Sequence, residues 1–404
     1  MEWKEFQISE IATLINGRAY SQDELFEKGK YKIVRVGNLS GGNKWFFSDM
    51  ELDADKYCYP NDLLFSWACN FGPHIWKNDK TIYHYHIWKV KEDSSKIDKY
   101  FFYYFLKYRT PYWLGNVNGS VMVHITKGTM EKQSIRIPVN LSDQRKIAGI
   151  LSALDAKIEN NNKINANLEA QAQALFKSWF VDFTPFKDQP FVDSELGPIP
   201  QGLKICQISD ISHTLENGRR QKGGAVSEGI PSVGAEHVKG MGTYDYSKTK
   251  YISPEFANKL KTGKINGYEL LIYKDGGKPG YFIPNFSIFG EGYPFDLCYL
   301  NEHVFKLDFL QNKGYNIFNY FQFKTNYVMS FLNAQGGKAA IPGINKKDIE
   351  CIYTFAPNNP KVVEFGNFAL PLFTKILRNC VENQRLAALR DTLLPKLMSG
   401  EIKL

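Results

Sequence analysis

The sequence predicts a mixed α and β fold with two α/β domains, each followed by a long helix, and the two helices are expected to pair as an antiparallel coiled coil. Three observations predict this fold: the first half of the chain recurs in the second, each copy closes near a proline, and each continues in a heptad pattern. The copies should be related by a pseudo-two-fold axis. The expected segments are a domain at 1–140, a helix at 141–183, a linker at 184–199, a domain at 200–356 and a helix at 357–404.

The duplication is clearest where each copy begins. QISEI at residues 7–11 returns as QISDI at 207–211, and TLINGR at 13–18 returns as TLENGR at 214–219. Later matches are KIVRVG ending at Gly37 with GIPSVG ending at Gly234, DLLFSW from Asp62 with ELLIYK from Glu269, and HIWKV from His86 with HVFKL from His303. A repeat of this length indicates two similar domains.

Each copy ends in apolar residues spaced by three and four, which predicts an amphipathic helix. An offset of 218 superimposes the two patterns, and an apolar stripe of this length needs a partner, so the helices should cover each other. Each would span roughly 60 Å at about 1.5 Å per residue. The predicted seam residues are Leu154, Ile158, Asn161, Leu168 and Leu175 in the first helix, and Leu372, Ile376, Asn379, Leu386 and Leu393 in the second.

Four asparagines interrupt this apolar seam: Asn161 and Asn165 in the first helix, and Asn379 and Asn383 in the second. Polar seam residues cost stability but fix the register of a coiled coil when they pair. The alternative is that this part of each helix faces a partner subunit. Between the first helix and the second domain, TPFKDQPFVDSELGPIP is rich in proline and acidic residues and is interpreted as a linker.

Composition narrows the class of protein. Hydrophobic residues make up 43% and charged residues 23% of the chain, which is typical of folded domains. No stretch approaches the roughly 18 apolar residues of a membrane span, and the first residues lack a signal-peptide core, so a cytoplasmic protein is expected. Six scattered cysteines without a CxxC pair predict reduced, mostly buried thiols and no metal site.

The positive charge is distributed over both domains. The formal net charge is +8, and Lys and Arg outnumber Asp and Glu by 19 to 16 in residues 1–140 and by 18 to 14 in 200–356. A moderate excess on two globular domains suits contact with phosphates of double-stranded DNA. Two unlike domains separated by a stiff pair of helices would contact a duplex at two places, with a fixed gap between half-sites of different sequence.

As a set, these segments resemble the specificity subunits of type I restriction enzymes, and the resemblance covers the whole chain. It is strongest in the repeated entries at Gln7 and Gln207, DLLFSW and ELLIYK, FVDSELGPIPQGLK, and LRDTLLPKLMSGEI from Leu389. It implies two target recognition domains that recognise an asymmetric bipartite DNA target, two methyltransferase partner subunits, and restriction subunits. S-adenosylmethionine, ATP and Mg are then expected on those partners, with no cofactor bound by this chain.

Candidate DNA contacts lie in matched loops. Where relatives often have a GGTP-like turn, this chain has NGRAYS from Asn16 and NGRRQK from Asn217, with glycines free to take positive φ beside Arg18, Arg219, Arg220 and Lys222. The alternative for these turns is a helix C-cap with solvated arginines. The remaining candidates are Lys77 in SWACNFGPHIWK, Lys274 and Lys278 in KDGGKPG, Ser120 and Lys127 in NGSVMVHITK, and Lys338 and Lys346 in AQGGKAAIPGINKK.

No catalytic residue is expected. The matched histidines His86 and His303 are interpreted as structural, since no second histidine stands at ligand spacing in both copies. Dinucleotide-binding GxGxxG, phosphate-binding GxxxxGK[ST] and the Asn/Asp-Pro-Pro-aromatic tetrapeptide of amino-methyltransferases are all absent from the sequence. The alternatives are a nuclease whose site escapes these motifs, or a coiled-coil scaffold that binds proteins.

Overall fold

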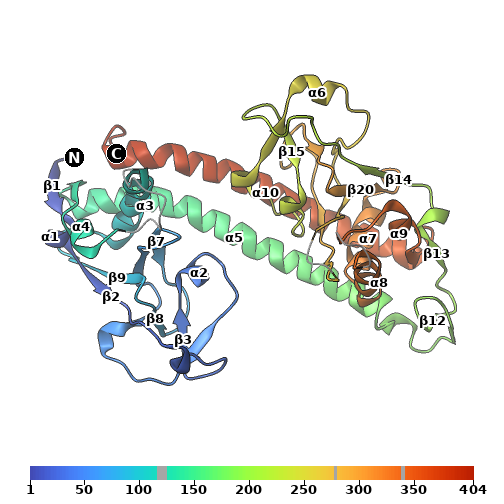
Figure 1. Ribbon diagram of the computed structural model, residues 1–404, viewed down its shortest axis with the longest axis horizontal. Helices are drawn as coiled ribbons and strands as arrows, with labels where there is room; N and C mark the ends of the chain where they lie inside the picture. Colours follow the sequence, from blue (N-terminus) through green and yellow to red (C-terminus); the bar gives the residue numbers. More distant parts are fainter. Residues whose placement is uncertain (116–124, 277–279, 338–341) are drawn as a thin grey trace. The chain divides into compact units, whose positions relative to one another are not determined.

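A computed structural model describes residues 1–115, 125–276, 280–337 and 342–404 of the chain (Figure 1). The chain forms two compact units: unit 1 comprises Met1–Lys157 and Leu386–Leu404, and unit 2 comprises Ile158–Arg385. The long helices α5 (Leu141–Phe180) and α10 (Pro360–Ser399) each contribute to both units. The sequence-based prediction listed the helices as segments separate from the domains, but their buried faces form part of the two cores.

The described residues of unit 1 form two four-stranded sheets. One has the order β2-β9-β6-β7 and is antiparallel, and the other has the order β4-β3-β8-β5 with a parallel β3–β8 pair. Strands β1 and β10 form a further antiparallel pair. The bounds are β1 Trp3–Gln7, α1 Ile8–Ile11, β2 Ala12–Asn16, η1 Gln22–Glu24, β3 Tyr31–Val34, α2 Val36–Leu39, β4 Phe46–Ser48, η2 Ala54–Lys56, β5 Tyr57–Cys58, β6 Leu63–Ser66, β7 Gly72–Ile75, β8 Thr81–Tyr83, β9 Ile87–Glu92, α3 Lys99–Gly115, α4 Lys127–Glu131 and β10 Ser134–Pro138.

Unit 2 repeats this topology. Its sheets have the orders β14-β20-β17-β18 and β16-β15-β19, with a parallel β15–β19 pair, and β13 pairs with β21 as β1 does with β10. The bounds are η3 Thr184–Phe186, β11 Phe191–Val192, β12 Ile199–Pro200, β13 Ile205–Gln207, η4 Ile208–Asp210, β14 Thr214–Asn217, β15 Ile230–Val233, η5 Ala235–His237, η6 Tyr246–Lys248, β16 Lys250–Ile252, α6 Pro254–Asn258, β17 Leu270–Tyr273, β18 Phe286–Ile288, β19 Tyr299–Leu300, β20 Val304–Asp308, α7 Lys313–Phe323, α8 Asn326–Gly336, α9 Lys346–Glu350 and β21 Tyr353–Phe355.

The matching topologies confirm the mixed fold and the internal duplication that the sequence predicts. One part of the sequence alignment is out of register, however. The Val34 carbonyl accepts from the His84 amide, and the Val233 carbonyl accepts from the Asn301 amide. Val34 therefore corresponds to Val233, two residues away from the match of Gly37 with Gly234. Strand pairing fixes this register, whereas short apolar strings in sequence match equally well after a shift of two.

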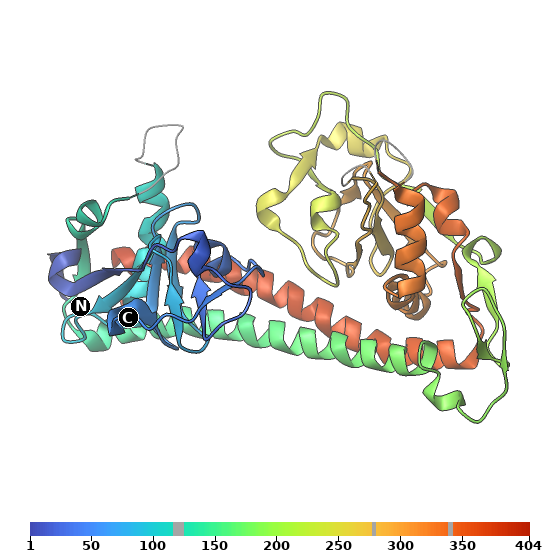
Figure 2. The ribbon, with the colours of Figure 1, turned by 60° about the horizontal axis from the view of Figure 1, so that its bottom comes forward.

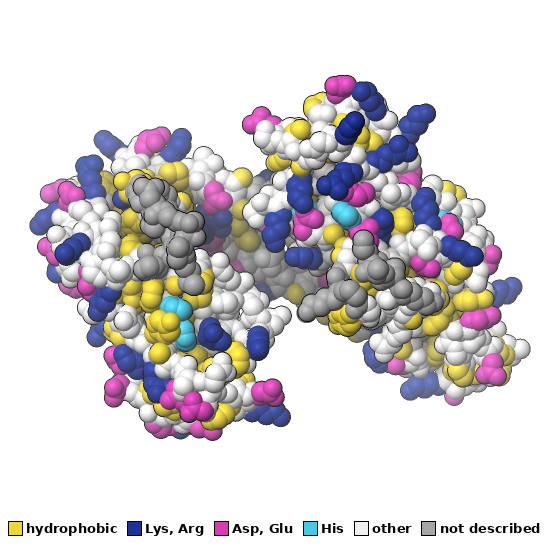
Figure 3. Space-filling view, in the orientation of Figure 1, with side chains coloured by type: hydrophobic (Ala, Val, Ile, Leu, Met, Phe, Trp, Pro, Cys, Tyr) yellow, Lys and Arg dark blue, Asp and Glu magenta, His cyan; other side chains and the backbone are white. Residues whose placement is uncertain are grey.

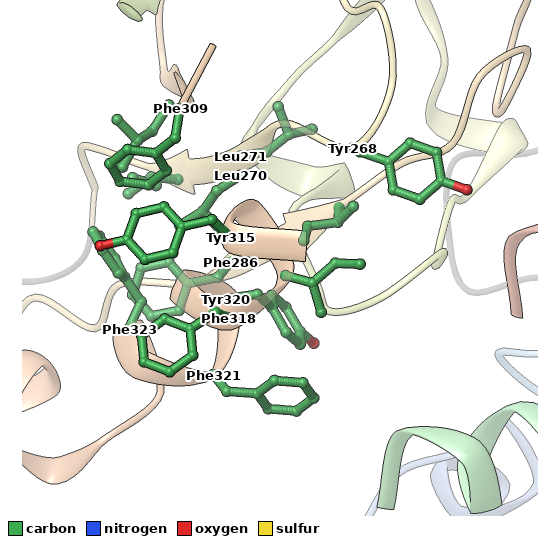
Figure 4. Close-up of a cluster of buried hydrophobic side chains, with 14 of the residues drawn as sticks. Tyr268, Leu270, Leu271, Phe286, Phe309, Tyr315, Phe318, Tyr320, Phe321 and Phe323 are labelled. Carbon is green, nitrogen blue, oxygen red and sulfur yellow. The ribbon is translucent and has the colours of Figure 1, made fainter. Parts of the chain in front are cut away.

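Each core includes one face of each long helix. In unit 2, Phe318 of α7 lies 4.9 Å from Phe180 of α5 and 5.9 Å from Phe365 of α10, measured between ring centroids. The aromatic residues of α7 form the centre of this core (Figure 4). In unit 1, Leu151 of α5 and Leu394 of α10 lie in one hydrophobic cluster with the residues of α3.

Within each unit, α10 runs antiparallel beside α5 (Figure 2). In unit 1, Arg390 forms an ion pair of 2.6 Å with Asp155, and Asp155 also accepts a hydrogen bond of 2.7 Å from the Tyr104 hydroxyl. The coiled coil that the sequence predicts is thus present. All predicted seam residues are buried or half-buried, but Phe176, Phe373 and Leu394 are more deeply buried than their neighbours in the predicted seam. At these three positions the most buried residue is the one after the predicted seam residue, because each packs into a hydrophobic core as well as against the other helix.

The seam asparagines pair with one another in unit 2. Asn161 donates a hydrogen bond of 2.9 Å to the side-chain oxygen of Asn383, and Asn379 donates one of 2.7 Å to that of Asn165. Asn161 and Asn379 are each 1% exposed. The offset of 218 relates Asn161 to Asn379 and Asn165 to Asn383, so it converts one bond into the other, as a local pseudo-two-fold axis requires. Of the two alternatives left open by the sequence, pairing across the coiled coil is correct.

The prediction of an unstructured linker at residues 184–199 is wrong in part. The segment contains the 3-10 turn η3, and β11 pairs with β12 in a short hairpin that closes at Ile199–Pro200. Phe186 and Ile199 are buried in the unit 2 core. Helix α5 ends at Phe180, and the chain reverses through Phe183, which has a left-handed φ of 50°. The apolar residues hold the segment against unit 2 despite its proline-rich composition.

None of the helices in the described part of the chain combines the length and apolar character needed to cross a lipid bilayer.

The six cysteines are unpaired: Cys58 and Cys298 are buried, Cys69 is exposed, and the other three are half-buried. The expectation of mostly buried thiols therefore holds fully for only two of them. Within the described ranges, no group of three or more His, Cys, Asp or Glu side chains could hold a metal ion.

Candidate DNA interface

The predicted Asn-Gly-Arg turns lie at the ends of strands. Asn16 ends β2 and Asn217 ends β14, so the alternative interpretation as helix C-caps is wrong. Neither glycine takes a positive φ. A Cβ on Gly17 would instead collide with backbone carbonyl oxygens of residues 83 and 84, and a Cβ on Gly218 with those of residues 300 and 301. The glycines are needed for close approach between two backbone segments.

This contact creates an equivalent site in each unit. We define corner 1 as residues 16–18, 67 and 83–86 of unit 1, and corner 2 as residues 217–220, 274 and 300–303 of unit 2. The equivalence rests on backbone hydrogen bonds: the Trp67 amide donates to the His86 carbonyl, and the Lys274 amide donates to the His303 carbonyl, each at 3.1 Å. Similar backbones therefore present different side chains.

Corner 2 carries a chain of charged side chains. Glu302 lies 3.6 Å from Arg220 and 3.4 Å from His303. The other ring nitrogen of His303 bonds to Asp275, whose second carboxylate oxygen lies 2.9 Å from the Lys274 ammonium. This chain presents both hydrogen-bond donors and acceptors, the kinds of group that the edges of base pairs offer in the major groove.

A shallow cavity of about 280 Å³ adjoins corner 2, and its lining includes Arg219, Arg220, Lys250, Asn301 and His303. Both arginines are exposed. Figure 3 shows lysine and arginine side chains gathered with acidic ones around a histidine on this unit. The structure thus brings together three of the predicted candidates, Arg219, Arg220 and Lys274.

Two further candidates of unit 2 lie on neighbouring segments. Lys222 is exposed on the loop that follows Arg220. Lys346 is exposed at the start of α9, just after Ile344, whose amide donates a hydrogen bond of 2.7 Å to the Lys274 carbonyl. This bond holds the segment before α9 against corner 2. Lys222 and Lys346 therefore extend the positive surface near the charged chain.

Corner 1 carries aromatic side chains in place of the charged ones. Trp67, His84, Tyr85 and His86 gather there, with ring centroids 5.1 Å apart for Trp67 and His86, and 3.9 Å apart for Tyr85 and His86. Burial lowers the pKa of His84 to about 4 and also lowers the pKa of His86. Both imidazoles are therefore neutral at pH 7, and Figure 3 shows hydrophobic side chains beside the histidines of this unit.

Arg18 differs from its counterpart Arg219, because its charge is already paired. The guanidinium lies 2.6 Å from Glu24 and stacks over the Tyr20 ring at 5.1 Å. Hydrogen bonding between the two side chains raises the pKa of Arg18 and lowers the pKa of Glu24 to about 2. The prediction of a phosphate contact is therefore weaker for Arg18 than for Arg219.

The remaining candidates of unit 1 lie outside corner 1 as defined. Lys77 is exposed directly after the buried Trp76, and Lys127 opens α4, where it lies 3.6 Å from Glu131. Lys127 and Lys346 occupy matching positions, each at the start of a short helix. The candidates Ser120, Lys278 and Lys338 lie outside the described residues.

Sequence reasoning did not select Trp67, Tyr85 or Glu302, which distinguish the corners, and it interpreted His86 and His303 as structural. His303 does have a hydrogen-bond partner, as expected for a structural residue, yet 46% of its side chain is exposed. The signal was present in the duplication, since HIWKV and HVFKL match while the residues before them, YHY and LNE, do not. Where two strands match but the loop residues before them differ, the difference indicates that the two domains bind different ligands through that loop.

Comparisons with known proteins agree with this architecture. Residues 1–170 match the family described as type I restriction modification DNA specificity domain. The chain is 30% identical over 319 residues to the type I restriction enzyme MjaIX specificity subunit of Methanocaldococcus jannaschii, covering 76% of this chain and 69% of that protein. It is 25% identical over 336 residues to the HindI specificity subunit of Haemophilus influenzae, covering 69% and 71% of the two chains.

A solved structure shares the fold. The S subunit of a type I restriction-modification system from M. genitalium matches with a TM-score of 0.57 at 17% identity, over 98% of this chain and 96% of that one. The sequence matches extend over both copies of the duplication, and the fold match extends over nearly the whole chain. The chain belongs to the family of type I restriction enzyme specificity subunits.

Proposed function

We propose that this chain recognises an asymmetric, bipartite DNA sequence for a type I restriction-modification complex, and that each unit contacts one half-site through its corner. The observation that carries the proposal is the pair of corners, which share a backbone arrangement and differ in side chains. Because the backbones of the two corners match, both units would approach a duplex in the same way. Because their side chains differ, the two corners would select different bases, which gives two unlike half-sites.

Corner 2 offers the groups that distinguish base pairs in the major groove. An arginine can donate two hydrogen bonds to guanine, and a carboxylate can accept one from the cytosine amino group. Arg219 and Arg220 supply the first kind of group, and Glu302 supplies the second. Lys222 and Lys346 are suited to phosphates, which position a protein without specifying sequence.

The long helices give the chain its proposed spacing role. The Asn161–Asn383 and Asn379–Asn165 bonds hold α5 and α10 in one register, as paired polar residues do in the seam of a coiled coil. A stiff pair of helices would keep the distance between half-sites constant. Adding one heptad to both helices should then change the gap in the target and leave each half-site sequence unchanged.

The proposed partners supply the chemistry. We expect two methyltransferase subunits, which bind S-adenosylmethionine, and restriction subunits, which use ATP and Mg, to assemble with this chain in the cytoplasm. Its own role would be recognition without catalysis. The acidic side chain of Asp155 on α5 is bound to Arg390 and Tyr104.

Methylation mapping tests the proposed function directly. The chain and its methyltransferase partners are produced in a host without other methylases, and methylated positions are mapped across the genome. A split motif with two different halves is expected. Methylation without a common motif, or no methylation by an assembled complex, would contradict the proposal. Affinity for a DNA that contains the motif should also fall steeply with salt, because phosphate contacts release counterions.

A further inference from the structure

Corner 1 is the surface end of a column of aromatic rings. Phe65, in the core, stacks on Trp88 at 5.9 Å with an interplanar angle of 15°, and Trp88 stacks on Trp67 at 5.9 Å and 21°. Trp67 then packs edge-on against His86, which contacts Tyr85. Phe65 and Trp88 are at most 2% exposed, whereas 38% of Tyr85 is exposed. The column thus presents a tyrosine on a rigid base.

The backbone around Tyr85 is fixed from several sides. Its amide donates to the Arg18 carbonyl at 3.0 Å, and its carbonyl accepts a bond of 2.8 Å from the indole nitrogen of Trp67. The Ile87 amide donates to the His84 carbonyl and closes the turn. Little conformational freedom would therefore be lost when the turn meets a ligand, which favours tight binding.

The neighbouring charges indicate what kind of ligand suits this tyrosine. The lowered pKa values of His84 and His86 leave both rings neutral, and the charge of Arg18 is paired with Glu24. The exposed Arg35 is close enough to lower the pKa of both histidines. Neutral aromatic rings beside the exposed Arg35 fit a base and the adjoining phosphate better than they fit a row of phosphates.

We propose that Tyr85 is a specificity-determining residue that unit 1 inserts against bases of its half-site, by stacking on a base or wedging into a base step. This inference rests on the proposed function. It implies that the two units recognise DNA by different chemistry, since Glu302, beside Arg220 and His303, occupies the matching position in corner 2. Apolar wedges of this kind tilt or unstack base steps, whereas charged side chains contact base edges without unstacking them.

The test uses the complex of the full chain with its methyltransferase subunits. Methylated motifs are mapped for the wild type, Tyr85→Ala, Tyr85→Phe and Glu302→Ala. Tyr85→Ala should relax or abolish one half-site and leave the other unchanged, and Glu302→Ala should affect the opposite half-site. Tyr85→Phe should retain the wild-type motif because it keeps the ring. The control is Tyr59→Ala, which removes an exposed tyrosine of the same unit and should leave both half-sites unchanged.

Binding measurements give the magnitude. Loss of one stacked base should weaken affinity for the full target by about 5- to 150-fold, since base–aromatic stacking contributes roughly 1–3 kcal/mol. A 2-aminopurine probe placed at successive positions of the unit 1 half-site should change its fluorescence at one step on binding the wild type, by brightening if the step is unstacked or by further quenching if the probe stacks on Tyr85, and this change should be absent with Tyr85→Ala. Equal melting temperatures for the two proteins would show that the exposed substitution leaves the fold intact.

The failures are distinguishable. If the wild type yields a split motif and Tyr85→Ala yields the same motif with affinity within twofold, the inference is wrong and the proposed function stands. Loss of the half-site in Tyr85→Phe would mean that the hydroxyl, and not the ring, makes the contact, which also overturns it. Failure of Tyr85→Ala to assemble with the methyltransferase subunits would assign corner 1 to a protein partner. If the wild type itself yields no split motif, the proposed function fails.

Discussion

Replacing Asn161 by alanine tests whether the paired asparagines hold the two long helices together. Asn161 is 1% exposed and donates hydrogen bonds of 2.8 Å to Glu382 and 2.9 Å to Asn383. Each such bond contributes about 0.5–1.5 kcal/mol, so Asn161→Ala should lower the free energy of unfolding by about 1–3 kcal/mol. The neighbouring Asn160 is exposed on the same helix. Asn160→Ala makes the same change in helix propensity and is the matched control.

The assay is urea unfolding followed by circular dichroism at 222 nm, which the helices dominate. The difference between the two variants isolates the buried bonds. In a double-mutant cycle, Asn161→Ala with Asn383→Ala should cost less than the sum of the single changes, because the second substitution removes a partner that the first leaves unpaired. Equal stabilities of Asn161→Ala and Asn160→Ala, or strictly additive costs in the cycle, would refute the assignment of the register to these bonds.

Three further outcomes follow from the corners. Gly218→Ala should lower the free energy of unfolding by about 1–3 kcal/mol and alter one half-site, because the added Cβ would collide with backbone atoms. As the control, Gly128→Ala should leave the melting temperature unchanged, because no atom lies within reach of a Cβ there. Glu24→Gln should release Arg18 and steepen the salt dependence of DNA binding by about one unit of log–log slope, and an unchanged slope would contradict the pairing. Burial lowers the pKa of His84 to about 4, from about 6.5 in the unfolded chain. The neutral ring therefore stabilises the fold above pH 6.5, and this contribution is lost as the pH falls through 4. His84→Gln should flatten the dependence of the melting temperature on pH between about 4 and 6.5.

The duplication made much of the fold predictable. Matching strings such as TLINGR and TLENGR established two similar domains, and the heptad spacing with its four asparagines established two helices in one register. These features are local or periodic, so they can be recognised without knowing how distant segments meet. The structure bears them out in the repeated sheet orders and in the bonds between Asn161 and Asn383 and between Asn379 and Asn165.

The errors of prediction all depend on distant contacts. The proline-rich segment at 184–199 looked like a free linker, but Phe186 and Ile199 are anchored in the unit 2 core. The match of Gly37 with Gly234 was two residues out of register, because it compared short apolar strings, whereas the hydrogen bonds between strands match Val34 with Val233.

The sequence by itself thus determined that this protein has two related α/β domains, two long helices that pair, and unequal loops suited to two different targets, because repeats and periodicity are written in neighbouring residues. Only the tertiary structure decided which side chains meet. It placed Trp67 beside the turn at Tyr85 and Lys274 beside the turn at Glu302, through backbone bonds between segments separated by tens of residues. The chemistry of recognition depends on such contacts, and no spacing along the chain encodes them.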